Sequence, residues 1–382
     1  MTFVYLTNSI GLHQVAVADE IYKILGDNFK FIELSNDDVS LGIHKEAEQG
    51  LDYTDRSYIL SAYKSSENMT LARRLINEAD ALRCGSVDAS WLEVRTAQKR
   101  LTFWTTERLF KKKLNAFGPR CIRNCIRLNT MFRKNPNMYL LANGAYVADD
   151  FRFFPSIRKH ILQWGYFPLF RELDIDSLLA SKPKDKIQLL WCARMIDWKH
   201  PEMVPKLAKR LKDTGMINFH IKMVGTGIMS HTIKNMIHDL GVSDYVEMIG
   251  GLSNDKVISE MQKSNIFVFT SDRQEGWGVV LNEAMNAGCA VVSADEIGAT
   301  KFLITDNTNG LIFKSCNIDD LYTKVVQLIG DEQYRLLLAK NAYHTIKTDY
   351  NPQTAARRIV DFSQSVLKGD CSFYKDSICS LL

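Results

Sequence analysis

Short apolar runs alternate with helical patterns along this chain, and the alternation starts afresh near residue 187. Strands that alternate with helices form parallel sheets with helices on both faces, so the pattern predicts two doubly wound α/β halves. The expected strands are 3–7, 29–34, 58–62, 81–84, 101–105 and 138–142, then 187–192, 219–224, 246–249, 266–270 and one that begins at 290. The expected helices include 13–25, 70–78, 201–212, 230–240 and 254–262.

A chain of 382 residues is too long for one ordinary core, so two domains are expected. We place an N-terminal Rossmann-like domain at 1–166 and a second Rossmann-like domain at 167–350. The last helix and tail, 351–382, could pack back on the N-terminal domain. Two such halves should face a central cleft, with ligands bound beyond the carboxyl ends of the strands.

The composition is that of a soluble globular protein, with 46% hydrophobic and 24% charged residues. No stretch approaches the ~20 apolar residues of a membrane span, and the start lacks a basic region and a cleavage site. We therefore expect a cytoplasmic protein. No His or Cys cluster has metal-ligand spacing, so no metal site is expected. Asp174-Ile175-Asp176 matches the Asp-x-Asp pattern of metal-binding sites, but we interpret it as a helix N-cap.

The net charge of +4 is unevenly distributed. Between Lys99 and Lys134 there are eleven Lys or Arg and one acid, Glu107, which gives a local charge of 11 − 1 = +10. Aromatic and aliphatic residues, among them Phe103, Phe110 and Ile126, interrupt the basic ones. A basic amphipathic surface suits an anionic membrane or a phosphate-bearing ligand, although a solvated helical face is the plain alternative. No nucleic-acid-binding motif accompanies the charge, so nucleic acid is not an expected partner.

Anion-binding groups follow several strands of the second half. Arg194 and Lys199 lie in one loop after 187–192, and a planar guanidinium with a point charge suits a diphosphate. The alternative interpretation is that Arg194 and Lys199 are solvent-exposed loop residues that bind no ligand. Gly225 belongs to a short VGTG loop after the next strand. Without a full GxGxxG this loop is weak evidence for a dinucleotide site.

The stretch QEGWGVVLNEAMNAGCAVVSA (274–294) runs from a glycine loop into a helix and a further strand. Gly276 and Gly278 would let the backbone approach a ligand, and the N–H groups of Val279 and Val280 would face a phosphate at the helix start. Carboxylates are repelled by phosphate. Glu275 and Glu283, which flank this point, should therefore accept hydrogen bonds from neutral hydroxyls, those of a sugar ring and a ribose.

These segments resemble the GT-B glycosyltransferases, in particular the retaining family-4 group. The motifs that carry the resemblance are WCARMIDWKHPE, VGTG, YVEMIGGLSNDKV, VFTSDRQEGWGVVLNEAMNAGCAVV and IGATKFLITDNTNGLIF. The resemblance implies that a nucleotide-diphosphate sugar binds the C-terminal domain. Its phosphates would be held by Arg194, Lys199 and the amides of Val279 and Val280, its ribose by Glu283 and its sugar by Glu275. The turn from Gly250 to Leu252 would contact the base.

The N-terminal half resembles the family more loosely. NSIGLHQVAVADEI looks like its first glycine loop, which places Gly11 near the phosphates in the closed state. Family members often carry a His later in this domain, but the corresponding region here reads LTFWTTERLFKKK, with Glu107 and Arg108 and no His. His13 lies in a suitable loop for a catalytic role, and a helix-capping surface His is the alternative.

The sequence therefore predicts a metal-independent, retaining glycosyltransferase with a UDP- or GDP-sugar as donor substrate and no separate cofactor. We expect a glycan or lipid-linked acceptor, a role in surface polysaccharide assembly, and peripheral attachment to an anionic membrane surface. The alternatives are a GT-B epimerase or phosphorylase and a non-catalytic nucleotide or nucleic-acid binding protein.

Overall fold

The computed structural model describes residues 1–35, 55–85, 87–111, 119–370 and 374–382. The chain forms two compact units, Met1–Leu169 with Asp349–Leu382, and Phe170–Thr348. No helix within the described residues combines the length and apolar character needed to cross a bilayer.

The first unit is built on a seven-stranded parallel sheet in the order β3-β2-β1-β4-β5-β6-β7. Its strands are β1 (Phe3–Thr7), β2 (Phe29–Glu33), β3 (Ile59–Ser61), β4 (Ala81–Gly85), β5 (Leu101–Glu107), β6 (Met138–Asn143) and β7 (Ile161–Trp164). Its helices are α1 (Leu12–Leu25), α3 (Ser66–Glu78), α4 (Glu93–Ala97), α5 (Pro119–Lys134), α6 (Val147–Asp150), α7 (Pro155–Arg158) and α16 (Pro352–Leu367).

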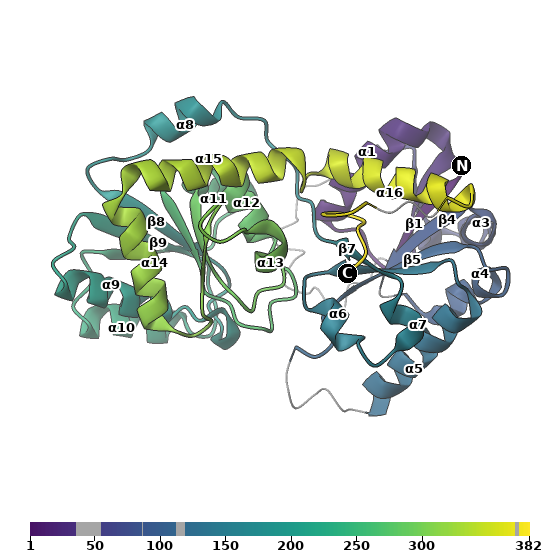
Figure 1. Ribbon diagram of the computed structural model, residues 1–382, viewed down its shortest axis with the longest axis horizontal. Coiled ribbons are helices and arrows are strands. Elements are labelled where there is room, and N and C mark those ends of the chain that lie inside the picture. Colours follow the sequence, from purple (N-terminus) through teal and green to yellow (C-terminus); the bar gives the residue numbers. More distant parts are fainter. Residues whose placement is uncertain (36–54, 86, 112–118, 371–373) are drawn as a thin grey trace. The chain divides into compact units, whose positions relative to one another are not determined.

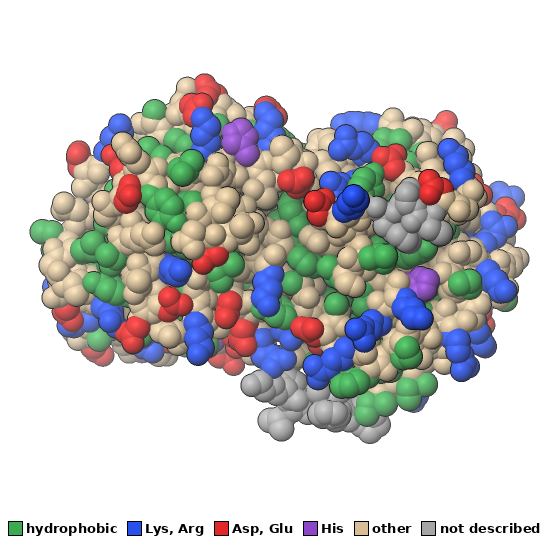
Figure 2. Space-filling model, in the orientation of Figure 1, with side chains coloured by type: hydrophobic (Ala, Val, Ile, Leu, Met, Phe, Trp, Pro, Cys, Tyr) green, Lys and Arg blue, Asp and Glu red, His purple; other side chains and the backbone are tan. Residues whose placement is uncertain are grey.

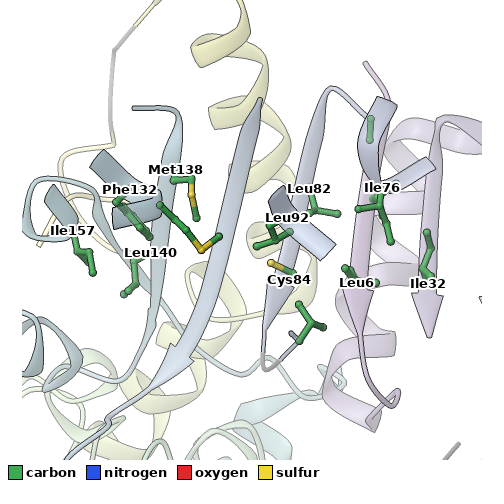
Figure 3. Close-up of a cluster of buried hydrophobic side chains, with 14 of the residues drawn as sticks. Leu6, Ile32, Ile76, Leu82, Cys84, Leu92, Phe132, Met138, Leu140 and Ile157 are labelled. Carbon is green, nitrogen blue, oxygen red and sulfur yellow. The ribbon is translucent and has the colours of Figure 1, made fainter. Parts of the chain in front are cut away.

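Side-chain alternation along these strands produces two apolar layers. On one face, Leu6, Leu82 and Leu140 pack with Ile76 of α3 and Leu92 in one buried cluster (Figure 3). The opposite face is aromatic and is covered by α1 and α16, which contact each other (Figure 1). There the ring of Phe362 from α16 lies 5.8 Å from that of Phe103 and 5.0 Å from that of Tyr139. The C-terminal helix thus belongs to the first unit.

The second unit contains a six-stranded parallel sheet in the order β10-β9-β8-β11-β12-β13. On one face helix α9 contacts both α10 and α14, and on the other face α12 contacts both α11 and α15 (Figure 1). The strands are β8 (Ile187–Cys192), β9 (Phe219–Val224), β10 (Val246–Gly250), β11 (Ile266–Phe269), β12 (Ala290–Ala294) and β13 (Leu311–Phe313). The helices are α8 (Ile175–Ser181), α9 (Met203–Asp213), α10 (Ser230–Asp239), α11 (Asn254–Lys263), α12 (Val280–Asn286), α13 (Thr300–Leu303), α14 (Ile318–Gly330) and α15 (Glu332–Thr348).

The predicted fold class of two parallel Rossmann-like sheets is confirmed. Two edge strands were not predicted. Strand β7 lies in a segment expected to connect the halves, and all four of its residues are buried beside β6. Strand β13 has only three residues. Runs this short carry too little periodicity to be distinguished from a loop.

Candidate active site

The loops after β8, β9, β10 and β11 hold the predicted donor-binding residues of the second unit. Because the carboxyl ends of parallel strands meet at one edge of a sheet, these loops gather at the same edge. The N–H of Gly225 donates to the carbonyl of Gly250 at 2.7 Å, which joins the β9 loop to the turn after β10. Leu252, two residues along that turn, is half-buried.

Gly225 packs the β9 loop directly on the β8 loop. Its φ is +128°, and a Cβ at this position would overlap the backbone carbonyl of Ala193. The same pair of loops exchanges hydrogen bonds, from Met195 N to Thr226 O at 2.9 Å and from Met229 N to Met195 O at 3.0 Å. Glycine is therefore required for the close approach of two backbones, a requirement that the sequence motif alone did not reveal.

Lys199 and Glu275 form an ion pair between the β8 and β11 loops. Their side chains are only 11% and 12% exposed, so the pair is shielded from solvent. The ammonium group of Lys199 also lies 4.2 Å from the centre of the Trp198 ring. Arg194, in contrast, is exposed, with its guanidinium 5.8 Å from the same ring. Lys199, which was assigned to the phosphates, and Glu275, which was assigned to the sugar, are thus immediate neighbours.

A buried hydrogen-bond chain holds the backbone of Lys199 in place. The hydroxyl of Thr270, just beyond β11, donates to the carbonyl of Lys199 at 2.7 Å and accepts the indole N–H of Trp191 at 2.8 Å. Thr270 and Trp191 are 0% and 1% exposed. Sequence reasoning missed both. Both lie within motifs that carried the family resemblance, WCARMIDWKHPE and VFTSDRQEGWGVVLNEAMNAGCAVV, but neither was given a role.

His200 links the same two loops on the solvent side. Its Nδ1 lies 2.9 Å from Glu202, and its Nε2 lies 3.5 Å from Asp272 in the β11 loop. The hydrogen bond with Glu202, together with the charges of Glu202 and Asp272, raises the pKa of His200 despite its partial burial. The backbone of Asp272 accepts the N–H of Glu275 at 3.0 Å. His200 therefore connects the loops that carry Lys199 and Glu275, and although it lies within the motif WCARMIDWKHPE, the sequence analysis gave it no role.

The loop from Gly278 leads into α12. Gly278 has a φ of +93°, and a Cβ there would lie 2.6 Å from the ring of Phe269. Val279 is the N-cap of α12 and Val280 is its first residue. The first N–H groups of a helix have no intrahelical acceptor, so these amides can donate to a ligand.

Glu283 follows one turn into α12 and is partly buried. Its Oε1 accepts a hydrogen bond from the side-chain amide of Asn254, at the start of α11, at 2.9 Å. Burial raises the pKa of Glu283, although the bond from Asn254 and the charge of Arg171 act in the opposite direction. Asn254 was not predicted, because its place beside Glu283 depends on how α11 and α12 pack.

In the first unit, Gly11 is the N-cap of α1, and its N–H donates to the side chain of Gln14 at 3.0 Å. The buried carboxylate of Glu33 accepts the N–H of Ile10 at 3.1 Å and so supports this loop. His13 is half-buried in α1, with its ring centre 4.8 Å from that of Tyr166. The side chain of His13 is therefore partly shielded from solvent.

The described cations of the basic stretch are distributed over different elements. Lys99 and Arg100 precede β5, whereas Arg108 and Lys111 follow it, so the strand separates them. Phe103 is 0% exposed and belongs to the core, because it points to the face covered by α16. The surface interpretation was wrong for this residue. Lys112, Lys113 and Phe117 lie outside the described residues.

Asp174 caps α8, since its Oδ1 accepts the N–H of Ser177 at 3.2 Å. The N-cap interpretation of Asp174-Ile175-Asp176 is confirmed. Within the described part of the chain, no group of three or more His, Cys, Asp and Glu could hold a metal ion.

In comparisons with known proteins, residues 179–345 match the family model described as Glycosyl transferases group 1. An uncharacterized glycosyltransferase of Methanocaldococcus jannaschii is 34% identical over 125 residues, which cover 33% of this chain and 35% of the relative. A GDP-mannose-dependent alpha-(1-6)-phosphatidylinositol monomannoside mannosyltransferase of Mycobacterium tuberculosis is 24% identical over 173 residues, or 44% of this chain and 42% of the relative. The chain thus spans less than half the length of either relative.

The fold is similar to that of solved glycosyltransferase structures. Anabaena HepE, solved with UDP and glucose, has a TM-score of 0.64 at 15% identity, with 96% of this chain and 100% of that chain covered. The lipopolysaccharide outer core galactosyltransferase WaaB has a TM-score of 0.66 at 14% identity, with 97% and 100% covered. Residues 179–345 thus match the glycosyl transferases group 1 family, and the two parallel Rossmann-like sheets give the chain a GT-B fold.

Proposed function

We propose that this protein transfers a sugar from a nucleotide-diphosphate sugar to a hydroxyl of a glycan acceptor, with retention of the anomeric configuration. The bond between the sugar C1 and the diphosphate oxygen breaks, and the nucleoside diphosphate leaves with the electron pair. The acceptor oxygen bonds to C1, and its proton passes to the leaving nucleoside diphosphate. The adjacent Lys199 and Glu275 at the carboxyl edge of the second sheet carry this proposal most directly.

Each predicted donor residue has a part in this proposal. Negative charge develops on the leaving diphosphate, where Arg194, Lys199 and the amides of Val279 and Val280 would stabilise it. Glu275, held by Lys199, would accept hydrogen bonds from the sugar hydroxyls. Glu283 would accept hydrogen bonds from the ribose, and the turn ending at Leu252 would contact the base. His13 is the candidate catalytic residue of the first unit. Gly11 and Gly225 would shape the phosphate-facing loops.

The acceptor is proposed to be a glycan on a lipid carrier, as in surface polysaccharide assembly. The name of the mycobacterial relative contains phosphatidylinositol monomannoside, a sugar attached to a lipid. In the first unit, Ile122 and Ile126 of α5 are 43% and 56% exposed, and Arg123 beside them is exposed. Lys and Arg side chains also lie between hydrophobic ones on the visible face of this unit (Figure 2). This mixture supports peripheral attachment to an anionic membrane.

A donor panel tests the proposal. Nucleoside diphosphate release is measured from UDP- and GDP-sugars with and without glycan acceptors, and binding of each donor is measured by thermal shift. We expect one base to raise the melting temperature and one donor to be turned over only with acceptor. A phosphorylase would instead need inorganic phosphate, an epimerase would change the donor without release, and a non-catalytic binding protein would bind without turnover. Any of these three results contradicts the proposal.

A further inference from the structure

A cavity of about 430 Å³ lies within the first unit. Its lining comes from the carboxyl ends of β1, β4, β5 and β6 and from the start of α1, and includes Tyr5, Arg83, Glu107, Asn143 and Tyr166. Strands β1 and β4 are neighbours in the sheet although the chain visits β2 and β3 between them. Ligands of parallel sheets bind at such a switch in strand order, and this volume falls within the ~300–1,000 Å³ of small-molecule sites.

Arg83 is a buried cation in this cavity. It is 5% exposed, and its guanidinium lies 4.0 Å from the ring centre of Tyr5 and 5.2 Å from that of Trp164. Its Nε has no hydrogen-bond partner, and no carboxylate of the described residues forms an ion pair with it. Burial lowers the pKa of Arg83 to about 9, so the side chain remains charged at neutral pH.

Arg95 shows how a structural arginine is accommodated in the same unit. It is 0% exposed, yet its guanidinium donates hydrogen bonds to the carbonyls of Ile76, Ala79 and Leu101 and to the hydroxyl of Thr102. Burying a cation without such compensation is unfavourable. The described residues offer Arg83 no such acceptor for its Nε, and a ligand anion in the cavity would supply one.

Two hydrogen-bond acceptors of the same cavity are also unsatisfied. The side-chain oxygens of Asn143 and Thr105 are buried and have no hydrogen-bond partner among the described residues. Asn143 is 2% exposed. Buried polar atoms are nearly always paired in folded proteins, so several unpaired ones in one cavity indicate a ligand that pairs with them. Acceptors of this kind suit the hydroxyl groups of a sugar.

The other charged groups of the lining have opposite charges close by. Glu107 accepts the hydroxyl of Tyr166 at 2.8 Å and the ammonium of Lys111 at 2.5 Å. Arg108 lies 4.0 Å from the carboxylate of Asp150. Among the described charged residues of the lining, Arg83 is therefore the one without an opposite charge nearby. It can bind an external group, and that group must be negative.

We propose that this cavity binds a hydroxylated oxyanion of the acceptor, such as a sugar phosphate, with Arg83 as the counterion and Asn143 and Thr105 as acceptors for its hydroxyls. The identification of the ligand as the acceptor rests on the proposed function. The cavity and its unpaired groups are independent of that function.

Direct binding tests the site without turnover. Calorimetry on the full chain, with saturating nucleoside diphosphate to fill the donor site, measures a hexose 1-phosphate, the free hexose and inorganic phosphate. We expect the hexose phosphate to bind at least tenfold more tightly than either of the others. Equal binding of the free hexose would mean that the anion is not recognised. Equal binding of inorganic phosphate would indicate a bare anion site and would overturn the acceptor assignment.

Arg83→Met separates a binding role from a structural one. Methionine preserves much of the packing and removes the charge, so the melting temperature should stay the same or rise while hexose phosphate binding falls at least tenfold. Arg95→Met should lower the melting temperature strongly, because it leaves several buried carbonyls unpaired. Arg83→Lys should retain part of the binding, and Arg158→Gln, at an exposed arginine of the same unit, should change nothing.

A lower melting temperature in Arg83→Met with unchanged binding would assign Arg83 to structure and end the proposal. If Arg83→Met cannot be purified, Asn143→Asp provides the second variant, since its carboxylate would compete with the ligand for Arg83; unchanged binding in Asn143→Asp overturns the site. Nucleoside diphosphate affinity should be unaltered in both variants. Failure of every donor to turn over, with Arg83-dependent binding intact, would contradict the proposed function and leave the site standing.

Discussion

Glu275 and Glu283 stand eight positions apart, but the structure gives them different surroundings. Glu275 is paired with Lys199, whereas Glu283 accepts a hydrogen bond from the neutral amide of Asn254. A carboxylate held by a cation keeps a fixed orientation, which suits contact with the reacting sugar. A carboxylate beside an amide can bind ribose hydroxyls. Substitutions of Glu275 and Glu283 should therefore have different effects on turnover and on nucleotide binding.

Glu275→Gln should lower turnover at least about a hundredfold, the cost of removing one polar group aimed at the transition state. Nucleoside diphosphate affinity should be retained, because Lys199 is freed to contact phosphate. Glu283→Ala should weaken nucleoside diphosphate binding by about 1–3 kcal/mol through the loss of charged hydrogen bonds. Calorimetry with the bare nucleotide and steady-state rates separate these effects, with exposed Glu332→Gln as the control. Equal losses of affinity in both variants would contradict the assigned roles.

The pH dependence of nucleotide binding should report Glu283. Burial raises the pKa of Glu283 above its ordinary value of 4.5, so it takes up a proton at a higher pH than an exposed glutamate does. Only the ionised form accepts two ribose hydrogen bonds, so affinity should be full above the raised pKa and fall as the pH is lowered through it. Glu283→Gln should remove this fall. An identical acid-side decline in that variant would mean that another group titrates.

At the scale of elements, the loops of the second unit are held by backbone contacts as much as by side chains. The β8 and β9 loops touch at Gly225, and the β8 and β11 loops are joined by Thr270 and by His200. These contacts fix the position of Lys199 relative to Glu275. A change that separates two loops should therefore affect both stability and donor binding.

Gly225→Ala tests this packing. Gly225 has a φ of +128° and an added Cβ would overlap the carbonyl of Ala193, so we expect a loss of more than about 3 kcal/mol in unfolding free energy. Gly215→Ala is the matched control, because Gly215 has a φ of +83° with nothing within 4 Å. There only the left-handed backbone is strained, at a cost of about 1 kcal/mol. Denaturant unfolding measures both, and equal losses would show that the loop contact is unimportant.

At the scale of the whole molecule, the positive charge at the proposed diphosphate site comes from side chains. Arg194 and Lys199 lie in the loop after β8, and among the described residues no His, Cys and carboxylate cluster could hold a metal. Activity should therefore remain within about twofold of its starting value after treatment with EDTA, since cationic side chains can stabilise the leaving group. Complete loss that Mg²⁺ or Mn²⁺ restores would contradict this prediction.

Liposome flotation tests the membrane proposal. The wild type should float with vesicles that contain anionic lipid and should detach as salt is raised, because screening shortens the reach of surface charge. A variant with Ile122→Asp, Ile126→Asp and Arg123→Glu should float at least tenfold less while its donor binding stays unchanged. The matched control is Ile228→Asp with Lys234→Glu, at exposed residues of the second unit. Flotation of the α5 variant at the wild-type level would exclude this surface.

Much of the architecture could be predicted because its causes are local. Apolar runs and helical spacing are set by neighbours in the chain, and they indicated most strands and the two parallel sheets. The N-cap at Asp174 is also a local effect, since its side chain bonds to an N–H three residues away. The two acids and glycines around α12 were recognisable because one short segment contains them all.

Only the tertiary structure decided which distant residues meet. Lys199 pairs with Glu275 and Asn254 with Glu283 because four loops converge at one edge of a sheet, and no local pattern encodes that convergence. The basic stretch is divided because β5 runs through it, and Phe103 is turned inward by strand alternation against a helix more than two hundred residues away in the chain. Arg83 looked like any strand residue. Only the folded sheet shows that the ends of several strands surround its guanidinium and that its Nε has no hydrogen-bond partner among the described residues.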